Sequence, residues 1–275
     1  MTTKRLWVHH EYPDNYVPPS FLGQLKRNGD VKEYRYWRVV EDTCVLALSI
    51  ALVQVFVAGF VGIYRAQLDP FWACIAASCH TVVLGLYWAK SDKNISILTT
   101  VKMACLLTMV VRALSPVFLS LTRSTSSDSI WHLGAWLCLL YVVLASVPMA
   151  EKQATKVMAT NTSLSATILF ASRLATADQV FYFLMLNMQT FVLLPSAGWW
   201  LRRTSRLIYL LFVANTCIIA SIMSWLYLDI RICVVGIFAQ LGVAFGIPRW
   251  FIIVQKYKDQ ISGPWDPAKA VIDDS

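Results

Sequence analysis

The chain has 275 residues, of which 57% are hydrophobic and only 15% charged, and its formal net charge is +8. Its mean hydropathy is +0.55. A soluble domain is about 45–50% apolar and about 25% charged, and a chain of this length cannot bury the excess apolar surface inside itself. The composition therefore excludes an ordinary soluble protein and predicts a chain that is solvated by lipid.

Hydrophobic stretches long enough to cross a bilayer occupy most of the chain. A spanning helix needs about 20 predominantly apolar residues. Eight stretches are expected to be such helices, the third and fifth carrying more polar residues than the others: Cys44–Tyr64, Phe71–Ala89, Leu98–Leu121, Ile130–Met149, Val157–Ala175, Gln179–Leu194, Leu207–Leu228 and Ile232–Val254. The predicted fold class is an all-α polytopic membrane protein, a bundle of about eight transmembrane helices with short loops.

The chain is expected to have three parts. These are an N-terminal segment over residues 1–43, a transmembrane domain over residues 44–254 and a C-terminal tail over residues 255–275. In the N-terminal segment, Asp30 and Glu33 can form a capping box at the start of a helix. Aromatic residues that suit the headgroup region follow directly. We therefore expect an N-terminal interfacial helix over residues 30–42 that leads into the first span.

The basic residues predict the orientation of the bundle. About 17 Lys and Arg residues fall in the two terminal segments and the even-numbered loops, and four fall in the odd-numbered loops. Cytoplasmic loops carry the Lys/Arg excess, so both termini are expected to be cytoplasmic. The basic residues are spread over short loops and form no stripe on a nucleic-acid reading module. No nucleic-acid partner is therefore expected.

Arg112 lies within the third predicted span, where a charged side chain is costly and often functional. Ser115 and Pro116 follow it on the same helix face, and Pro116 frees a backbone carbonyl in the preceding turn. Two interpretations stay open: Arg112 is held by that carbonyl or a neighbouring helix, or it contacts a lipid phosphate or a partner subunit. The predicted spans contain no carboxylate. The counter-charge is therefore expected to be the carbonyl, a loop aspartate such as Asp128, a partner or a phosphate.

Two further polar segments complete this candidate lipid or partner site. The loop after the third span is rich in Ser and Thr, and its Asp128 is expected to cap the helix of the fourth span. The fifth span holds seven Ser, Thr and Asn residues within 13 positions, among them Ser163 and Ser165, and Arg173 ends it. Small hydroxyl residues let helices approach closely and hydrogen-bond across the contact. We therefore expect the fifth helix to be buried among others, in this chain or in a partner.

The sequence contains no pattern that predicts catalysis by this chain alone. It has no H-E-x-x-H, G-x-S-x-G or phosphate-binding P-loop, and the predicted extramembrane residues are too few for a nucleotide-binding βαβ unit. His80 and His132 stand singly in apolar surroundings, and the seven cysteines form no CxxC pair. We therefore expect no catalytic residue, no metal site and no cofactor. A scaffold or lipid-handling subunit is favoured over an autonomous enzyme.

Five sequence blocks carry a resemblance to a known family. They are Glu11–Val17 with Phe21–Leu22, Tyr34–Trp37, Leu114–Leu119 with Leu121–Thr122 and Ser127–Ile130, Ser163–Ser165 with Phe170–Leu174, and Ile261–Asp266. Each block alone is weak evidence, but the five run in order over nearly the whole chain. Together they resemble the PIG-C family, whose members are membrane subunits of phosphatidylinositol N-acetylglucosaminyltransferase.

The resemblance implies a multi-pass subunit in the endoplasmic reticulum membrane. The complex moves N-acetylglucosamine from UDP-N-acetylglucosamine to phosphatidylinositol, the first step of glycosylphosphatidylinositol (GPI) anchor synthesis. The implied partners are the catalytic subunit PIG-A, the subunits PIG-H, PIG-P, PIG-Q and PIG-Y, phosphatidylinositol and membrane lipid. Short, rigid, aromatic motifs near the two ends either dock these partners or anchor the ends at the interface: Tyr12, Pro13, Asp14, Asn15, Tyr16, Gly263, Pro264 and Trp265.

Two alternatives from other functional classes stay open. One is an autonomous glycosyltransferase that uses a lipid-linked donor. Such enzymes typically use a luminal acidic residue, for which Asp69 in the first luminal loop is the candidate. The other is a small lipid or solute transporter, although the predicted spans lack the carboxylates of a proton relay.

Overall fold

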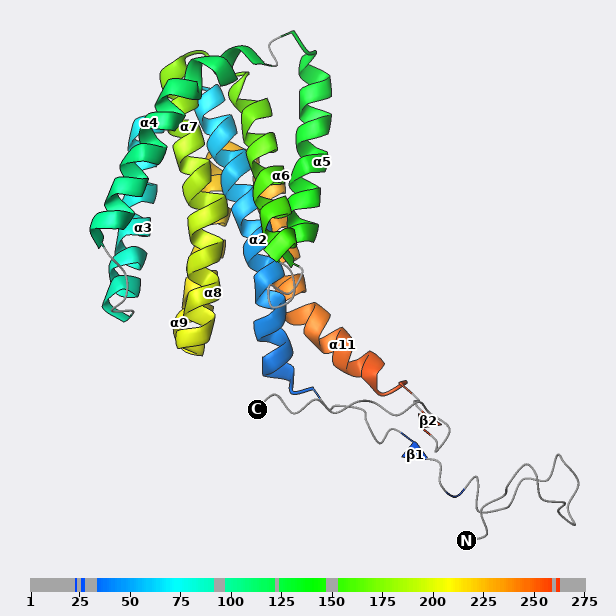
Figure 1. Ribbon diagram of the computed structural model, residues 1–275. Helices are drawn as coiled ribbons and strands as arrows, with labels where there is room; N and C mark the ends of the chain where they lie inside the picture. Colours follow the sequence, from blue (N-terminus) through cyan, green and yellow to red (C-terminus); the bar gives the residue numbers. More distant parts are fainter. Residues whose placement is uncertain are drawn as a thin grey trace, which may run out of the picture. The chain divides into compact units, whose positions relative to one another are not determined.

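The computed structural model describes residues 34–91, 97–121, 124–146 and 153–258, together with residues 23, 26–27 and 261–262 (Figure 1). The chain divides into two compact units. One consists of residues 1–35 and 250–275, and the other of residues 36–249. In the first unit, strand β1 (Lys26–Arg27) pairs antiparallel with strand β2 (Ile261–Ser262), so the N-terminal and C-terminal segments meet.

Eight helical rods make up the described part of the chain from residue 36 to residue 255, one for each predicted span. They are α2 (Tyr36–Tyr64), α3 (Pro70–Ser91), α4 (Ile97–Leu121), α5 (Ser127–Ser146), α6 (Gln153–Ala171), α7 (Ala177–Met188) continuing through η1 (Gln189–Leu193) into α8 (Leu194–Thr204), α9 (Arg206–Tyr227), and α10 (Ile230–Leu241) continuing through η2 (Gly242–Gly246) into α11 (Ile247–Gln255). The all-α fold class is confirmed.

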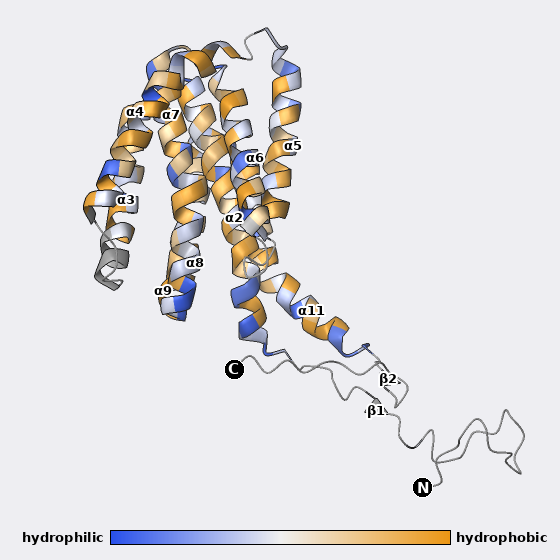
Figure 2. Cartoon of the chain, in the orientation of Figure 1, coloured by the Kyte–Doolittle hydropathy of each residue, from blue (hydrophilic) through white to orange (hydrophobic). Residues whose placement is uncertain are grey.

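Six of these rods are long and apolar enough to cross a membrane, judged on the described residues. The two that fall short are α3, whose described apolar part is Pro70–Gly85, and α6, which carries the hydroxyl residues. Figure 2 shows hydrophobic residues along the rods and hydrophilic ones near the lower ends of α2 and α9. The chain is thus a multi-pass membrane protein with six long apolar spans and two shorter or more polar rods.

Residues 36–42, the described part of the helix expected over residues 30–42, are helical and lead into the first span as expected. They open α2, which runs without a break to Tyr64. No Pro or Gly interrupts this stretch before Gly59, and Glu41 and Asp42 find arginine partners, so the helix can pass through the expected boundary at residue 43. Residues 30–33 lie outside the described part.

Helix α2 is the central helix of the second unit and packs against α5, α7, α9 and α10 (Figure 1). Its Phe56 and Phe60, each 1% exposed, meet Phe170 of α6 and Phe183 of α7 with ring centroids 4.8 to 5.7 Å apart. Edge-on and offset aromatic pairs at this spacing add stability beyond area burial. This aromatic core joins α2, α6 and α7.

Two of the rods contain a π-helical segment that ends two positions before a proline. A proline has no N–H, so it cannot donate to the carbonyl four residues earlier. Pro248 thereby frees the Ala244 carbonyl, to which the Thr43 hydroxyl of α2 donates at 3.4 Å. Pro195 follows η1 in the same way and cannot donate to the Phe191 carbonyl. π segments inside helices often mark functional positions.

Candidate functional site

The end of helix α4 bends at Pro116. Because this proline cannot donate to the Arg112 carbonyl, the last turns of α4 are free to leave the helix axis. In Figure 1 they turn across the end of the bundle toward α5. Ser115 is fully buried at the bend, and its hydroxyl donates to the Val111 carbonyl at 2.7 Å. Arg112, one turn before this proline, lies close to the first turn of α7, against which α4 packs.

Arg112 forms an ion pair with Asp178 of α7. The distance from Arg112 Nη1 to Asp178 Oδ1 is 2.5 Å, and the guanidinium lies over the Phe181 ring at 5.2 Å from its centroid. The two side chains are 54% and 66% exposed. The structure therefore supplies the counter-charge from a loop-end aspartate of this chain, and the residue is Asp178 rather than Asp128.

Local sequence explains why Asp178 stands at this place. Helix α7 begins with a capping box, in which the Thr176 side chain accepts from Gln179 N–H and the Gln179 side chain accepts from the cap N–H. A carboxylate in the first turn is favoured by the partial positive charge of the helix N-terminus. Asp178 is thus stabilised by α7 itself before it contacts Arg112. Thr108, Met109 and Ala113 of α4, with Arg112, Phe181 and Tyr182, line an open groove around the pair.

The other predicted site residues are not gathered around Arg112. Asp128 lies within the first turn of α5, and the residue whose side chain caps this helix is Ser126, whose hydroxyl oxygen accepts from Ser129 N–H at 3.4 Å. The expected cap at Asp128 is therefore shifted by two residues. The Ser126 hydroxyl caps better because it sits just outside the helix.

The hydroxyl groups of α6 bond mainly within their own helix. Ser163 is buried and donates to the Thr160 carbonyl at 2.8 Å, and Ser165 is exposed and donates to the Asn161 carbonyl at 2.9 Å. Arg173, just after α6, donates to the Thr125 carbonyl and ties the two loops together. α6 packs against α5 and α7, so one of its faces is buried in this chain. The end motifs Tyr12–Tyr16 and Gly263–Trp265 lie outside the described residues.

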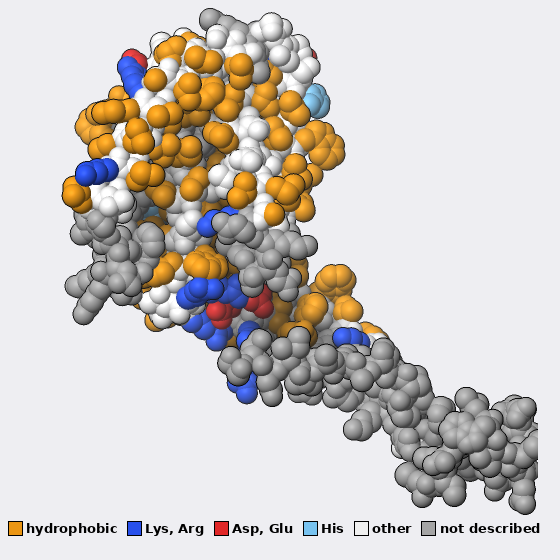
Figure 3. Space-filling model, viewed as in Figure 1, with side chains coloured by type: hydrophobic (Ala, Val, Ile, Leu, Met, Phe, Trp, Pro, Cys, Tyr) orange, Lys and Arg blue, Asp and Glu red, His pale blue; other side chains and the backbone are white. Residues whose placement is uncertain are grey.

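A second polar cluster joins α2, α8 and α9 at the opposite end of the bundle from Asp178. Arg202 pairs with Asp42 and, at 3.6 Å, with Glu41, and Arg206 pairs with Glu41 at 3.3 Å. Arg206 also donates to the Trp37 carbonyl at 2.8 Å. Figure 3 shows acidic and basic side chains gathered there. The Glu41 side chain is only 18% exposed, so this network is partly buried and fixes the start of α2.

The sequence analysis did not predict this cluster, because it used the arginines only to infer the orientation of the bundle in the membrane. The signal that could have revealed it is the pair of acidic residues directly before an apolar run. Glu41 and Asp42 face the basic end of a bundle, where an unpaired carboxylate near lipid would be costly. Paired acids and arginines at one end of a helical bundle predict a fixed contact between helix ends.

Comparison with known proteins gives the family. A family model described as GPI2, phosphatidylinositol N-acetylglucosaminyltransferase, matches residues 3–266. The GPI2 subunit of Schizosaccharomyces pombe is 30% identical over 96% of this chain and 85% of its own length. The GPI2 subunit of Saccharomyces cerevisiae is 26% identical over 98% and 97%. The PIG-C protein of Homo sapiens, a subunit of the same transferase, is 27% identical over 97% and 92%.

No solved structure matches the chain. The family match covers nearly all of the sequence, including the two ends, the bend of α4 and the arginine cluster. The chain therefore belongs to the GPI2 (PIG-C) family of phosphatidylinositol N-acetylglucosaminyltransferase subunits.

Proposed function

We propose that this chain acts as a non-catalytic membrane subunit, which holds the catalytic subunit at the membrane and helps to present phosphatidylinositol. As a family member it is a subunit of the GPI N-acetylglucosaminyltransferase complex, which carries out the first step of GPI anchor synthesis. The observation that carries the proposal is the helical bundle itself. Its described residues 36–249 form membrane-type helices and short connections, with no βαβ unit of the kind that binds nucleotide sugars.

The direct test is activity of the isolated chain. Purified alone in lipid nanodiscs, it is expected to transfer no N-acetylglucosamine from UDP-N-acetylglucosamine to phosphatidylinositol. The rival autonomous enzyme would depend on Asp69, whose Oδ1 accepts from Phe71 N–H at 2.9 Å and so caps α3. Asp69→Asn should therefore leave transfer by the assembled complex unchanged. Turnover by the isolated chain, abolished by Asp69→Asn, would establish the rival, and solute flux in liposomes holding only this chain would establish a transporter.

The proposed arrangement has eight membrane helices with both termini on the cytoplasmic side of the endoplasmic reticulum. The excess of basic residues in the terminal segments and even-numbered loops supports it. α3 and α6 are included as spans because both pack against α7 within the bundle. Cysteine labelling at Ser91 and Ser127, in a background without native cysteines, should place these two positions on opposite sides. Labelling from the same side would refute the arrangement.

The proposed partners are the catalytic subunit PIG-A and the subunits PIG-H, PIG-P, PIG-Q and PIG-Y. The motifs Tyr12–Tyr16 and Gly263–Trp265 are proposed to dock them, and β1 pairing with β2 supports this because it brings the two end segments together. Deleting residues 1–20 keeps β1, whereas deleting residues 1–28 removes it. Both deletions should weaken co-purification of partners while the bundle stays inserted. Undiminished co-purification would mean that the ends only anchor at the interface.

Arg112 and helix α6 are proposed to form a partner contact near the other end of the bundle. The exposed Arg112–Asp178 pair and the exposed hydroxyl of Ser165 support a polar contact there. Arg112→Leu should reduce assembly of the complex, whereas Arg112→Lys, which keeps the charge, should reduce it less. Normal assembly and transfer with Arg112→Leu would show that the pair is only structural. Loss of transfer in both variants with assembly intact would indicate lipid recognition instead.

A further inference from the structure

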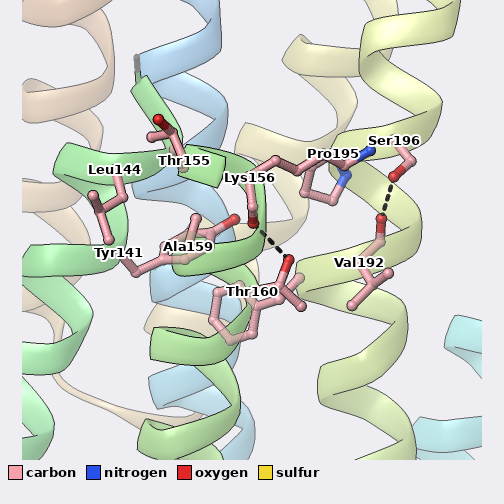
Figure 4. Close-up of a pocket in the computed structure, with 11 residues that line it drawn as sticks. Tyr141, Leu144, Thr155, Lys156, Ala159, Thr160, Val192, Pro195 and Ser196 are labelled. Atoms are coloured by element: carbon pink, nitrogen blue, oxygen red, sulfur yellow. Dashed lines mark hydrogen bonds between the residues drawn. The ribbon is translucent and has the colours of Figure 1, made fainter. Parts of the chain in front are cut away.

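Helix α8 presents a polar and aromatic face beside a small groove. Ser196, Trp199 and Arg203 are spaced i, i+3 and i+7, so they lie on one face of the helix. Pro195 and Ser196 line the groove at one end of this face, and Lys156 of α6 lines it from the other side. In Figure 4 the Lys156 side chain extends from α6 toward Pro195 and Ser196. One cation, Arg203, thus lies on the same face of α8 as Trp199, and a second, Lys156 of α6, faces the first turn of α8 across the groove.

Neither of these cations has an acidic partner in the described part of the chain. The neighbouring Arg202 and Arg206 are paired with the acidic residues of α2, whereas no ion pair among the described residues involves Arg203 or Lys156. Arg203 instead stacks on Trp199, with its guanidinium carbon 3.7 Å from the ring centroid. Trp199 is 42% exposed, and both cations are exposed. The ring contact places the guanidinium against Trp199, and the exposed side chain leaves it accessible to a ligand.

The groove is lined mainly by apolar side chains, and its polar residues are Thr155, Lys156, Thr160 and Ser196. Its lining includes Tyr141, Leu144, Ala145, Ala159, Phe191 and Val192 from α5, α6 and the α7–α8 rod. Its volume is about 40 Å³. That space holds about one water molecule, so the groove cannot enclose a ligand and can only accommodate part of one along its surface. A mainly apolar groove with Lys156 in its lining and Arg203 two turns along α8 from Ser196 matches an amphiphile with an anionic head and an aliphatic chain.

We propose that Arg203, Trp199 and Lys156 bind the phosphate of an anionic phospholipid, with an acyl chain lying along the groove between α6 and α8. A guanidinium makes bidentate hydrogen bonds to phosphate, and Lys156 adds a point charge from the opposite side. Trp199 suits the interface because its ring is amphipathic. An acidic segment of a partner would use the same cations but not the apolar groove, which favours a lipid.

This inference extends the proposed function. It rests on that proposal in one respect, the assignment of the site to the cytoplasmic leaflet. With both termini cytoplasmic, this end of the bundle faces the cytoplasmic leaflet. A lipid held there would present its headgroup toward the side from which a soluble nucleotide sugar arrives. The chemistry of the site, in contrast, does not depend on the rest of the complex and can be tested on the isolated chain.

The test is calorimetric titration of the full-length chain in detergent with three probes: dihexanoyl phosphatidylinositol, dihexanoyl phosphatidylcholine and inositol 1-phosphate. We expect phosphatidylinositol to bind at least tenfold more tightly than the other two, because it alone combines net negative charge with acyl chains. Equal binding of phosphatidylcholine would overturn the anionic part of the proposal. Equal binding of inositol 1-phosphate would overturn the lipid part and indicate a free phosphate as the source.

Substitutions test whether lipid binding depends on these particular residues or on the overall positive charge of the chain. Arg203→Gln should weaken phosphatidylinositol binding by roughly tenfold or more, since charge-assisted hydrogen bonds are lost. Arg203→Lys should lose less, and Lys156→Gln should add to the loss of Arg203→Gln. The matched control is Arg65→Gln, which removes one exposed charge outside the groove and should change nothing. Melting temperatures of all variants report whether the bundle is intact.

The outcomes also separate this proposal from the proposed function. Unchanged lipid binding in the folded variant carrying Arg203→Gln and Lys156→Gln would refute the site. If that variant also failed to co-purify partners, the face would be a docking surface for an acidic partner segment instead. Neither result bears on whether the chain is catalytic, which depends only on turnover by the isolated protein.

Discussion

Removing the charge of Asp178 tests whether the Arg112 pair lies in the headgroup region or in hydrocarbon. An exposed ion pair facing water contributes about 0–1 kcal/mol. A carboxylate in the first turn of a helix adds about 0.3–1 kcal/mol. An unpaired guanidinium left in hydrocarbon costs at least about 2.5–3.5 kcal/mol. The two locations therefore predict different losses on the same substitution.

The structure favours the headgroup region. Asp178 lies in the opening turn of α7, directly after a loop, and therefore at an end of the bundle. We expect Asp178→Asn to lower the free energy of unfolding by about 0.3–2 kcal/mol, the sum of the two smaller contributions. Equilibrium unfolding in mixed micelles measures this loss. A loss of about 3 kcal/mol or more, the range for an unpaired charge in hydrocarbon, would refute the headgroup location.

A double-mutant cycle isolates the contact itself. Arg112→Gln and Asp178→Asn, alone and combined, should give a coupling free energy of about 0.2–1 kcal/mol. The matched control is Asp229→Asn, because Asp229 caps α10 by accepting from Arg231 N–H at 2.8 Å but has no ion pair among the described residues. Asp229→Asn should lose stability as a cap and show no coupling to Arg112. Zero coupling between Arg112 and Asp178 would mean that the contact contributes nothing.

Three further substitutions probe the packing and the arginine cluster. A Cβ at Gly134 would overlap the Phe170 ring, so Gly134→Ala should destabilise the α5–α6 contact by about 1–3 kcal/mol, whereas Gly85→Ala meets no neighbouring atom and should not. Phe56→Ala removes a ring that is 1% exposed and should cost about 3–5 kcal/mol in the same unfolding assay. Glu41→Gln leaves two arginines without their shared carboxylate, so protease cleavage near the start of α2 should become faster; unchanged cleavage would show that the network does not hold this helix end.

The apolar runs predicted the rods well because membrane helices must satisfy their backbone internally and be apolar outside. Their ends were harder to predict. The sixth span was expected to end at Leu194, directly before Pro195, yet the rod continues through α8 to Thr204. A π segment accommodates the proline, and such a segment leaves no mark in hydropathy. The added turns carry Trp199 and Arg203, which is why the sequence reasoning overlooked this face.

The sites themselves depended on contacts between distant helices. Arg112 was recognised as unusual because charge inside an apolar run is rare. Its partner could not be deduced, since the approach of α4 to α7 depends on how the two helices pack in the bundle. Asp128 and Asp178 both stand near helix starts, and only the fold distinguishes them. Hydropathy locates helices, but their pairing requires the packed structure.

Pro195 stands between the π segment of the α7–α8 rod and the proposed lipid site, which gives a last prediction. Restoring the N–H with Pro195→Ala lets η1 relax to an α-helix, and a one-residue change in register rotates the following turns by about 100°. Trp199 and Arg203 would then turn away from Lys156 although none of the three is altered, so phosphatidylinositol binding should weaken. Pro248→Ala, which relaxes η2 in another rod, should leave binding unchanged. Equal binding in both variants would show that the π segment before Pro195 does not position the site.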